Sequence, residues 1–387
     1  MNVDCSKNRQ IRKRCPEIVN PNIRTNVSIP FRLMAGLALA VFCLLEGTAW
    51  SGFDIDGMKL PPGFTVSTYV TGTGFDPDRG RDARGIPAIV TLTFDLQGTL
   101  YLARTANRLR EIYGRDTASI YRIPPGGAKI NPKNEGEFLF GPPLSDPDEA
   151  GVNRKGEVFV STSDRSKGFG SVYRLSPSGR ASLFAGGPPA RGKPPLLKDP
   201  EGIAFDQAGH VYVVDDALGV VVKLDSEGNV LNPRFLSNVG RGRTLTYDPR
   251  GYLWIGSDGA HYTPHMDGSG KIYRVSLPNG KPKLLHTGPL PSGMSLSPGG
   301  NLFVAQRRSA KLFALTPEGK RVEFATFTGR SALRTLAFPP VTKETKKLGI
   351  AGDLFVIVFP MLDYPVREVI RISGPFDAYV KKASRGR

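Results

Sequence analysis

The sequence predicts an all-β fold, a six-bladed β-propeller built from four-stranded antiparallel blades. Three observations lead to this prediction: a strand–turn–strand unit recurs, a third strand follows each unit, and the two ends of the repeat array complement each other. Gly and Pro account for 45 and 33 of the 387 residues, which is typical of many short strands joined by tight turns. Internal repetition with a period near 50 residues indicates a propeller or a solenoid.

The clearest repeat unit is PEGIAFDQAGHVYVVDDALGVVVKLDSEGNV, which spans residues 200–230. Strands rich in Val, Ile, Phe and Tyr alternate in it with Asp-x-x-Gly and other Gly-containing turns. The corresponding turn glycines lie 42 to 58 residues apart, about the length of one blade. They are Gly98, Gly156, Gly209, Gly251, Gly300 and Gly352.

The third strand recurs six times, and its copies indicate how the ring closes. The copies are SIYRI at Ser119, SVYRL at Ser171, VVVKL at Val220, KIYRV at Lys271, KLFAL at Lys311 and EVIRI at Glu368. A short fourth strand follows each of the first five, but nothing similar follows the sixth. The segment 64–72, FTVSTYVTG, has the fourth-strand pattern and precedes the first blade. We therefore expect 64–71 to pair with 368–372, because an unclosed ring would leave two sheet edges exposed.

The first 49 residues predict an export signal rather than a part of the propeller. A basic stretch precedes the 13-residue apolar run Leu33 to Leu45, which is shorter than the roughly 20 residues of a membrane span. Small residues follow, so we expect cleavage after Ala49 and one propeller domain over 50–387. The mature protein would then be periplasmic or extracellular and lack a transmembrane span. An uncleaved membrane anchor is the alternative.

Composition limits the chemistry that is open to the propeller. The three cysteines, Cys5, Cys15 and Cys43, all lie in the leader, which excludes disulfides, thiolate metal sites and a cysteine nucleophile from the rest. The net charge of +17 predicts attraction to anionic polymers or lipids, unless the charge is only scattered, as the lack of long like-charge runs indicates. No aromatic–basic stripe accompanies the charge, so we expect no nucleic-acid binding.

Long loops predict that the functional site lies on one face of the ring, around the mouth of the central channel. The Asp-x-x-Gly turns of the opposite face are tight and leave little room for chemistry. Polar residues at the starts of first strands and the ends of second strands should surround the mouth. We expect ligand binding from Arg104, Glu149, Asp164, Glu201, Asp215, Arg243, Asp258, Gln306 and Arg334. These residues form either a pocket for an anionic or hydroxylated ligand or charge pairs that hold neighbouring blades together.

Histidine is scarce, and two of the four histidines lie in one loop. His261 and His265 are candidates for a general base or a metal ligand, although their spacing lies on a loop rather than a helix. We expect His210, in a turn, and His286, in a strand, to be structural. The alternating acids of residues 76–82 are expected to form a salt-bridged surface loop rather than a calcium loop.

The unit at 200–230 resembles the NHL repeat, and residues 60–380 are similar to a wider group of propellers. That group contains NHL propellers, SMP-30-like gluconolactonases and soluble sugar dehydrogenases, and the segment Leu60 to Phe64 is similar to the opening of sorbosone dehydrogenase-like propellers. The resemblance specifies a fold better than a function. It implies that Glu201 matches the glutamate with which such lactonases hold a channel metal. The Pro-Asn-Gly of the lactonases is absent, and Arg243 stands where an aspartate is expected, which opposes metal binding.

Three functions remain open. The first is a monomeric exported propeller that binds a small polar or anionic ligand, or an envelope or extracellular protein or polymer. The second is a metal-dependent lactonase-type hydrolase, with Glu149, Glu201, Asp215 and Asp258 holding a divalent cation such as Ca²⁺ in the central channel. The third is a quinone-dependent sugar oxidoreductase that uses His261 or His265 as a base. The poor agreement with the lactonase metal ligands favours the first.

Overall fold

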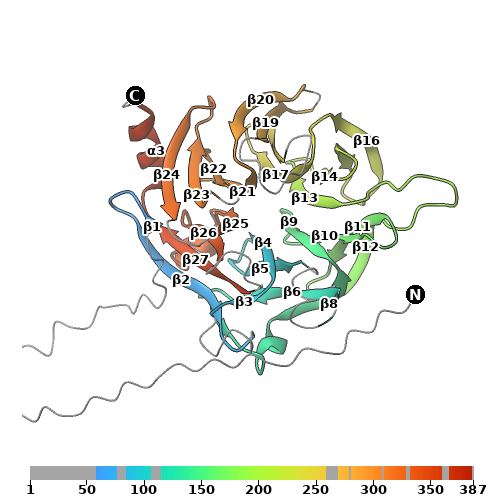
Figure 1. Ribbon diagram of the computed structural model, residues 1–387, viewed down its shortest axis with the longest axis horizontal. Helices are drawn as coiled ribbons and strands as arrows, with labels where there is room; N and C mark the ends of the chain where they lie inside the picture. Colours follow the sequence, from blue (N-terminus) through green and yellow to red (C-terminus); the bar gives the residue numbers. More distant parts are fainter. Residues whose placement is uncertain are drawn as a thin grey trace, which may run out of the picture. The chain divides into compact units, whose positions relative to one another are not determined.

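The computed structural model describes residues 58–75, 84–105, 114, 116–258, 269–278, 280–306, 309–327, 332–359 and 366–385. All belong to one compact unit, Ser51–Arg387. The strands described there form six antiparallel sheets, arranged as blades around a central axis (Figure 1). The predicted six-bladed β-propeller is confirmed. The predicted signal segment and the loop with His261 and His265 lie outside the described residues.

Each blade has four strands, which follow one another in chain order from the axis outward except in the sixth blade, whose outermost strand is the N-terminal β2. The innermost strands are β4 (Ile89–Phe94), β9 (Pro147–Val152), β13 (Pro200–Phe205), β17 (Gly242–Asp248), β21 (Pro291–Leu296) and β25 (Ala332–Ala337). The second strands are β5 (Leu100–Arg104), β10 (Val158–Asp164), β14 (Val211–Asp215), β18 (Tyr252–Ser257), β22 (Leu302–Gln306) and β26 (Leu354–Phe359). The third strands are β6 (Thr117–Ile123), β11 (Phe169–Leu175), β15 (Val220–Leu224), β19 (Gly270–Ser276), β23 (Lys311–Leu315) and β27 (Val366–Ser373). The outermost strands are β8 (Leu139–Ser145), β12 (Ala181–Gly186), β16 (Val230–Ser237), β20 (Lys283–Gly288), β24 (Arg321–Phe327) and the N-terminal β2 (Thr65–Gly72).

The N-terminal strand closes the ring as the sequence predicts. Strand β2 pairs antiparallel with β27, in a register that places Val66 opposite Ile372 and Val70 opposite Val369. After β27 the chain turns into helix α3 (Phe376–Arg385) instead of forming a fourth strand of its own. Both ends of the described chain therefore complete the last two blades, as Figure 1 shows for β2 beside β27 and α3 beside β24.

Several short elements were not predicted. The strand β7 (Ala128–Ile130) leaves the first blade and pairs parallel with β2, so it covers the outer edge of the closing strand. It leads into the short 3₁₀ helix η1 (Glu135–Glu137). The strands β1 (Met58–Lys59) and β3 (Ile86–Pro87) add to β24 and β27.

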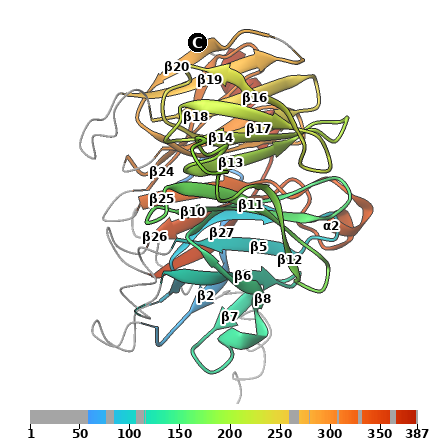
Figure 2. The ribbon, with the colours of Figure 1, turned by 90° about the vertical axis from the view of Figure 1, so that its right-hand side faces the viewer.

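Helix α2 (Lys343–Lys347) lies on the face of the tight turns. Figure 2 shows it projecting from the ring when the ring is seen from the side. The hydroxyl of Thr342 caps the helix and also donates a hydrogen bond to the carbonyl of Leu96, in the first turn of the first blade. The insertion that carries α2 is thus fastened to the neighbouring blade. No helix in the described part of the chain is long and apolar enough to span a membrane.

The hydrophobic core is divided among the interfaces between blades. Six main clusters of buried apolar side chains are described, and each contains residues from two neighbouring blades. Between the fifth and sixth blades, Phe376 of α3 packs with Phe64 and Phe303, whose ring centroids lie 4.9 and 5.4 Å away. Every blade must bury both faces, which explains why its strands alternate apolar residues toward the two neighbours.

The Asp-x-x-Gly turns hold the inner hairpins on the tight-turn face. Asp206 shows the pattern: one carboxylate oxygen accepts hydrogen bonds from the backbone N–H groups of Ala208 and His210. Gly209 has φ +85°, a backbone conformation that favours glycine. The ring Nδ1 of His210 lies 2.8 Å from the other carboxylate oxygen of Asp206, so the His210 side chain stabilises the turn.

Candidate functional site at the mouth of the channel

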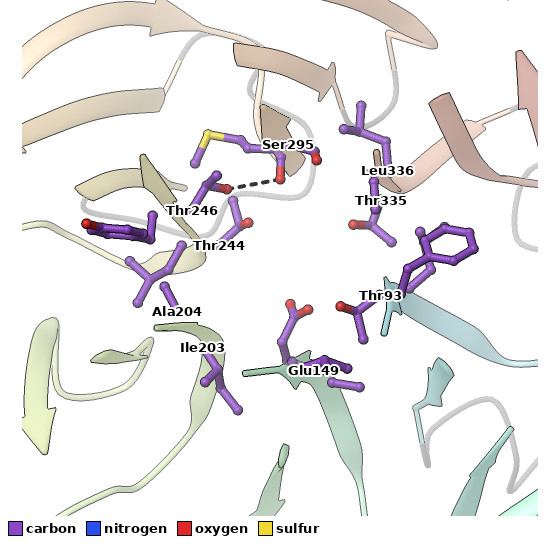
Figure 3. A pocket seen from close by; sticks show the side chains of 18 of the residues that line it. Thr93, Glu149, Ile203, Ala204, Thr244, Thr246, Ser295, Thr335 and Leu336 are labelled. Carbon is purple, nitrogen blue, oxygen red and sulfur yellow. Dashed lines mark hydrogen bonds between the residues drawn. The ribbon is translucent and has the colours of Figure 1, made fainter. Parts of the chain in front are cut away.

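The inner strands of all six blades enclose a central cavity of about 260 Å³. Small and hydroxylated side chains line much of it, because the strands converge toward the axis and leave little room. Figure 3 shows these hydroxyl groups around the cavity, from Thr93, Thr244, Thr246, Ser295 and Thr335. Glu149 is the charged residue of the described lining, and its carboxylate points into the cavity.

Three carboxylates lie together where the second and third blades meet. Asp148, Asp199 and Glu201 each offer one oxygen, and these oxygens lie within 4.8 Å of one another. We call these residues the acidic cluster. Among the residues that the structure describes, they are the group of three or more potential metal ligands that comes together in this way.

Hydrogen bonds between blades position the cluster. The hydroxyl of Thr91 in the first blade donates to the carbonyl of Asp148 at 3.0 Å. The hydroxyl of Ser161 in the second blade donates to the carbonyl of Glu201 at 2.9 Å. Both strand starts are irregular, with register shifts where β9 meets β10 and where β13 meets β14. These bulges redirect side chains at the channel mouth.

The cluster contains carboxylate oxygens that the protein itself does not satisfy. Asp148 is 5% exposed, and its Oδ2 is buried without a hydrogen-bond partner, as is Oδ1 of Asp199. Burial, and then repulsion by Glu201, Asp146 and Asp199, raises the pKa of Asp148 well above its ordinary value, although the charge of Arg334 opposes this. Buried acids normally have a hydrogen-bond donor or a cation beside them, so this cluster fits a bound cation.

Two more acids respond to the same electrostatic field. Burial, followed by repulsion from Glu201, raises the pKa of Asp199 to about 6, and Arg165 opposes the rise. Burial and Glu201 likewise raise the pKa of Glu149 well above its ordinary value, against the charge of Arg334. Acidic groups are therefore concentrated from the rim of the mouth to the upper part of the channel, and burial and mutual repulsion favour their protonated forms when no cation is bound.

An ion-pair network links the third and fourth blades beside the cluster. Nη1 of Arg243 lies 2.6 Å from Oε1 of Glu201, and its Nε lies 2.5 Å from Oδ2 of Asp258. Burial opposes the charge of Arg243, but Glu201, Asp258 and Asp216 outweigh it and raise its pKa. These three predicted residues do come together, and their arrangement pairs charges across a blade interface.

The structure does not gather the four acids expected to hold a metal. Of these, Glu201 belongs to the acidic cluster, Glu149 points down the channel, and Asp258 pairs with Arg243. The carboxylate of Asp215 accepts hydrogen bonds from the backbone N–H groups of Lys198, Asp199 and Leu218. It therefore orders the segment that presents Asp199.

Other predicted site residues lie apart from the cluster. Arg104 is fully buried within the first blade, where it donates to the Ser119 carbonyl at 2.8 Å and to Glu135 at 2.9 Å. Asp164 orders the loop between β10 and β11. Gln306 is buried at the end of β22 and accepts a hydrogen bond from the Ser309 hydroxyl.

Asp148 and Asp199 were not among the predicted site residues. The glutamates at the strand starts were predicted instead of the aspartates beside them. The usable signal was the recurrence of two acids beside a proline, Pro147-Asp148-Glu149 and Asp199-Pro200-Glu201, about one blade apart. Of the first pair only Asp148 enters the cluster, at a bulge in β9, whereas both acids of the second pair do.

Comparisons with known proteins support the fold. No protein-family model matches the chain, and no curated protein matches it by sequence. An auxiliary nutrient binding protein from Bacteroides ovatus is similar in structure, with a TM-score of 0.53 and 12% identity over 81% of this chain and 77% of that one. A second auxiliary nutrient binding protein, from Bacteroides thetaiotaomicron, has a TM-score of 0.53 and 14% identity over 80% and 76%. A Thermus thermophilus protein described as an oxidoreductase (glucose dehydrogenase) has a TM-score of 0.50 and 16% identity over 80% and 100%.

Proposed function

We propose that this protein is an exported propeller that binds a small, oxygen-rich ligand at the mouth of its channel, with a divalent cation held by Asp148, Asp199 and Glu201. The observation that carries the proposal is the acidic cluster itself. Its three carboxylates lie within 4.8 Å of one another, and Oδ2 of the buried Asp148 has no partner.

The chemistry of the ligand set favours a hard cation. Carboxylate oxygens are the ligands that Ca²⁺ and Mg²⁺ take, and Ca²⁺ tolerates irregular arrangements of them. When bound, such a cation would supply a positive centre for the hydroxyl or carboxylate oxygens of a ligand. The protein would contribute the hydroxyl-lined channel below, formed by Thr93, Thr244, Thr335 and their neighbours.

Two further considerations agree with a binding role. Two structures with a similar fold, each with a TM-score of 0.53, are named auxiliary nutrient binding proteins. Export is supported by the basic leader and the apolar run at 33–45, which have the pattern of a secretion signal.

The test is the melting temperature of the full chain in EDTA and then with Ca²⁺, Mg²⁺ or Zn²⁺. A cation at 100 times its dissociation constant stabilises the folded state by about 2.7 kcal/mol, which should raise the melting temperature by at least about 2 °C. The Asp148→Asn variant should lose this gain. The control is Glu227→Gln, which changes an exposed acid in a turn of the opposite face. A melting temperature that no cation changes would refute the proposed site.

A further inference from the structure

Arg165 lies beside the acidic cluster on a loop whose backbone is held in place. The loop joins β10 to β11, and the carboxylate of Asp164 organises it. That carboxylate accepts a hydrogen bond from the Ser166 hydroxyl at 2.7 Å and from the Lys167 backbone N–H at 3.1 Å. The Asp164 carbonyl also accepts from the Gly168 N–H at 2.8 Å. The start of the Arg165 side chain is therefore fixed at the rim.

The guanidinium of Arg165, in contrast, is only loosely held. Its Nη2 lies 3.7 Å from Oδ2 of Asp199, and the side chain is 57% exposed. Such solvent-screened pairs contribute little to stability. Arg243 differs, because two carboxylates hold it and its side chain is 15% exposed. Arg243 cannot move away without leaving two buried carboxylates unpaired. The guanidinium of Arg165 is already largely in solvent, so it can move away from the cluster more easily.

The cluster nevertheless acts on Arg165. Burial opposes its charge, but Asp199, Asp146, Asp148 and Glu201 outweigh burial and raise its pKa. Two of these four acids carry the oxygens of the cluster that have no hydrogen-bond partner: Oδ2 of Asp148 and Oδ1 of Asp199. A divalent cation that bound these oxygens would stand in the same negative field as the guanidinium and would repel it.

We propose that Arg165 is a displaceable counter-ion, which occupies the field of the acidic cluster and competes with a divalent cation for it. This inference rests on the proposed cation site and adds to it the residue that sets its affinity. When the cation binds, the Arg165 side chain moves out toward solvent while its loop stays in place. The cation affinity of the wild-type protein is then lower than that of the carboxylates alone.

The experiment is calorimetric titration of the full chain with Ca²⁺ alone, after treatment with EDTA and removal of the chelator. The variant Arg165→Gln should bind Ca²⁺ about threefold to tenfold more tightly, because a repulsive unit charge near a divalent ion has been removed. Arg165→Lys should stay close to wild type. Added NaCl should narrow the difference between Arg165→Gln and wild type, since salt screens exposed charges.

The matched control is Arg180→Gln. Arg180 is exposed in the turn between β11 and β12, on the opposite face of the same blade, so this variant removes the same net charge far from the cluster. Its Ca²⁺ affinity should equal that of wild type. Misfolding would not mimic the expected result, because Arg165→Gln should gain affinity.

The outcomes separate this inference from the proposed function. Equal or weaker Ca²⁺ binding by Arg165→Gln, with clear binding by wild type, would overturn the counter-ion and leave the cation site intact. An equal gain in Arg180→Gln would also overturn it, because the effect would then be one of net charge. If wild type and Arg165→Gln alike bind none of Ca²⁺, Mg²⁺ and Zn²⁺ when the titration is run with each, both proposals are refuted.

Discussion

Thr71 of β2 donates its hydroxyl hydrogen to a carboxylate oxygen of Glu368 in β27, across the seam where the N-terminal strand closes the ring. The other oxygen of Glu368 is buried and has no hydrogen-bond partner. Burial raises the pKa of Glu368 to about 7, although the Thr71 hydrogen bond and the charge of Arg84 lower it. The seam of the ring therefore contains a carboxyl group that folding keeps protonated in mildly acidic solution.

This carboxyl group predicts a pH dependence of stability. Its pKa in the folded protein lies above the ordinary value of 4.5, so the unfolded chain releases the proton first as the pH rises. Stability should fall between about pH 4.5 and pH 7, by about 3 kcal/mol in total for this group. Glu368→Gln should remove that part of the loss and be the more stable protein at pH 8. Urea unfolding from pH 4.5 to 8 measures this, and parallel curves for the two proteins would contradict it.

Arg243 is predicted to hold the third and fourth blades together. Arg243→Gln should destabilise the protein by about 3–5 kcal/mol, because it leaves Glu201 and the buried Asp258 without their shared cation. The measurement is urea unfolding at pH 7, with Arg180→Gln as the control for lost positive charge. A loss below about 1 kcal/mol would show that this ion-pair network contributes little to the free energy of unfolding.

Gly202 is predicted to be required by a close approach between blades. A Cβ atom at this position would lie 2.7 Å from the backbone nitrogen of Leu245 and 2.9 Å from Cα of Thr244. Gly202→Ala should therefore displace an inner strand and cost about 1–3 kcal/mol. Gly136→Ala is the control, since a Cβ there meets nothing within 4 Å. Thermal melting of both variants distinguishes a close contact from a general effect of replacing glycine.

Asp148 is predicted to destabilise the protein when no cation is present. Its buried Oδ2 has no partner, and neighbouring acids repel its charge. Asp148→Asn should therefore raise the stability of the EDTA-treated protein by about 1–3 kcal/mol, whereas Glu227→Gln, at an exposed position, should leave it nearly unchanged. Chemical unfolding in EDTA provides the comparison. A destabilised Asp148→Asn protein would indicate that the carboxylate has a structural role.

The number of blades and the closure of the ring were predictable, because the signals for both are local. Strand residues alternate between Asp-x-x-Gly turns, and each turn needs its own glycine, as Gly209 with φ +85° illustrates. No fourth strand follows the last copy of the recurring third strand, at Glu368. Residues 64–72 have the fourth-strand pattern but precede the first blade. An unpaired edge at each end of the chain leaves one way to complete the ring.

The candidate site was only partly predictable, because side chains from different blades meet there. Glu201, Arg243 and Asp258 were expected at the mouth and do come together. Arg104 was expected there too, but it turns into its own blade, where Ser119 and Glu135 accept its hydrogen bonds. Strand position alone does not say which face of a sheet a long side chain will follow.

By itself, the sequence determined the architecture, since hydrophobic alternation and turn chemistry act over a few residues and repeat along the chain. The tertiary structure alone decided that Asp148 and Asp199 join Glu201. A bulge at the start of β9 separates Asp148 from Glu149, and Asp215 at the end of β14 holds the backbone of Asp199 at the start of the third blade. Whether two carboxylates lie within 5 Å depends on such offsets, which arise when neighbouring blades pack and which no spacing along the chain encodes.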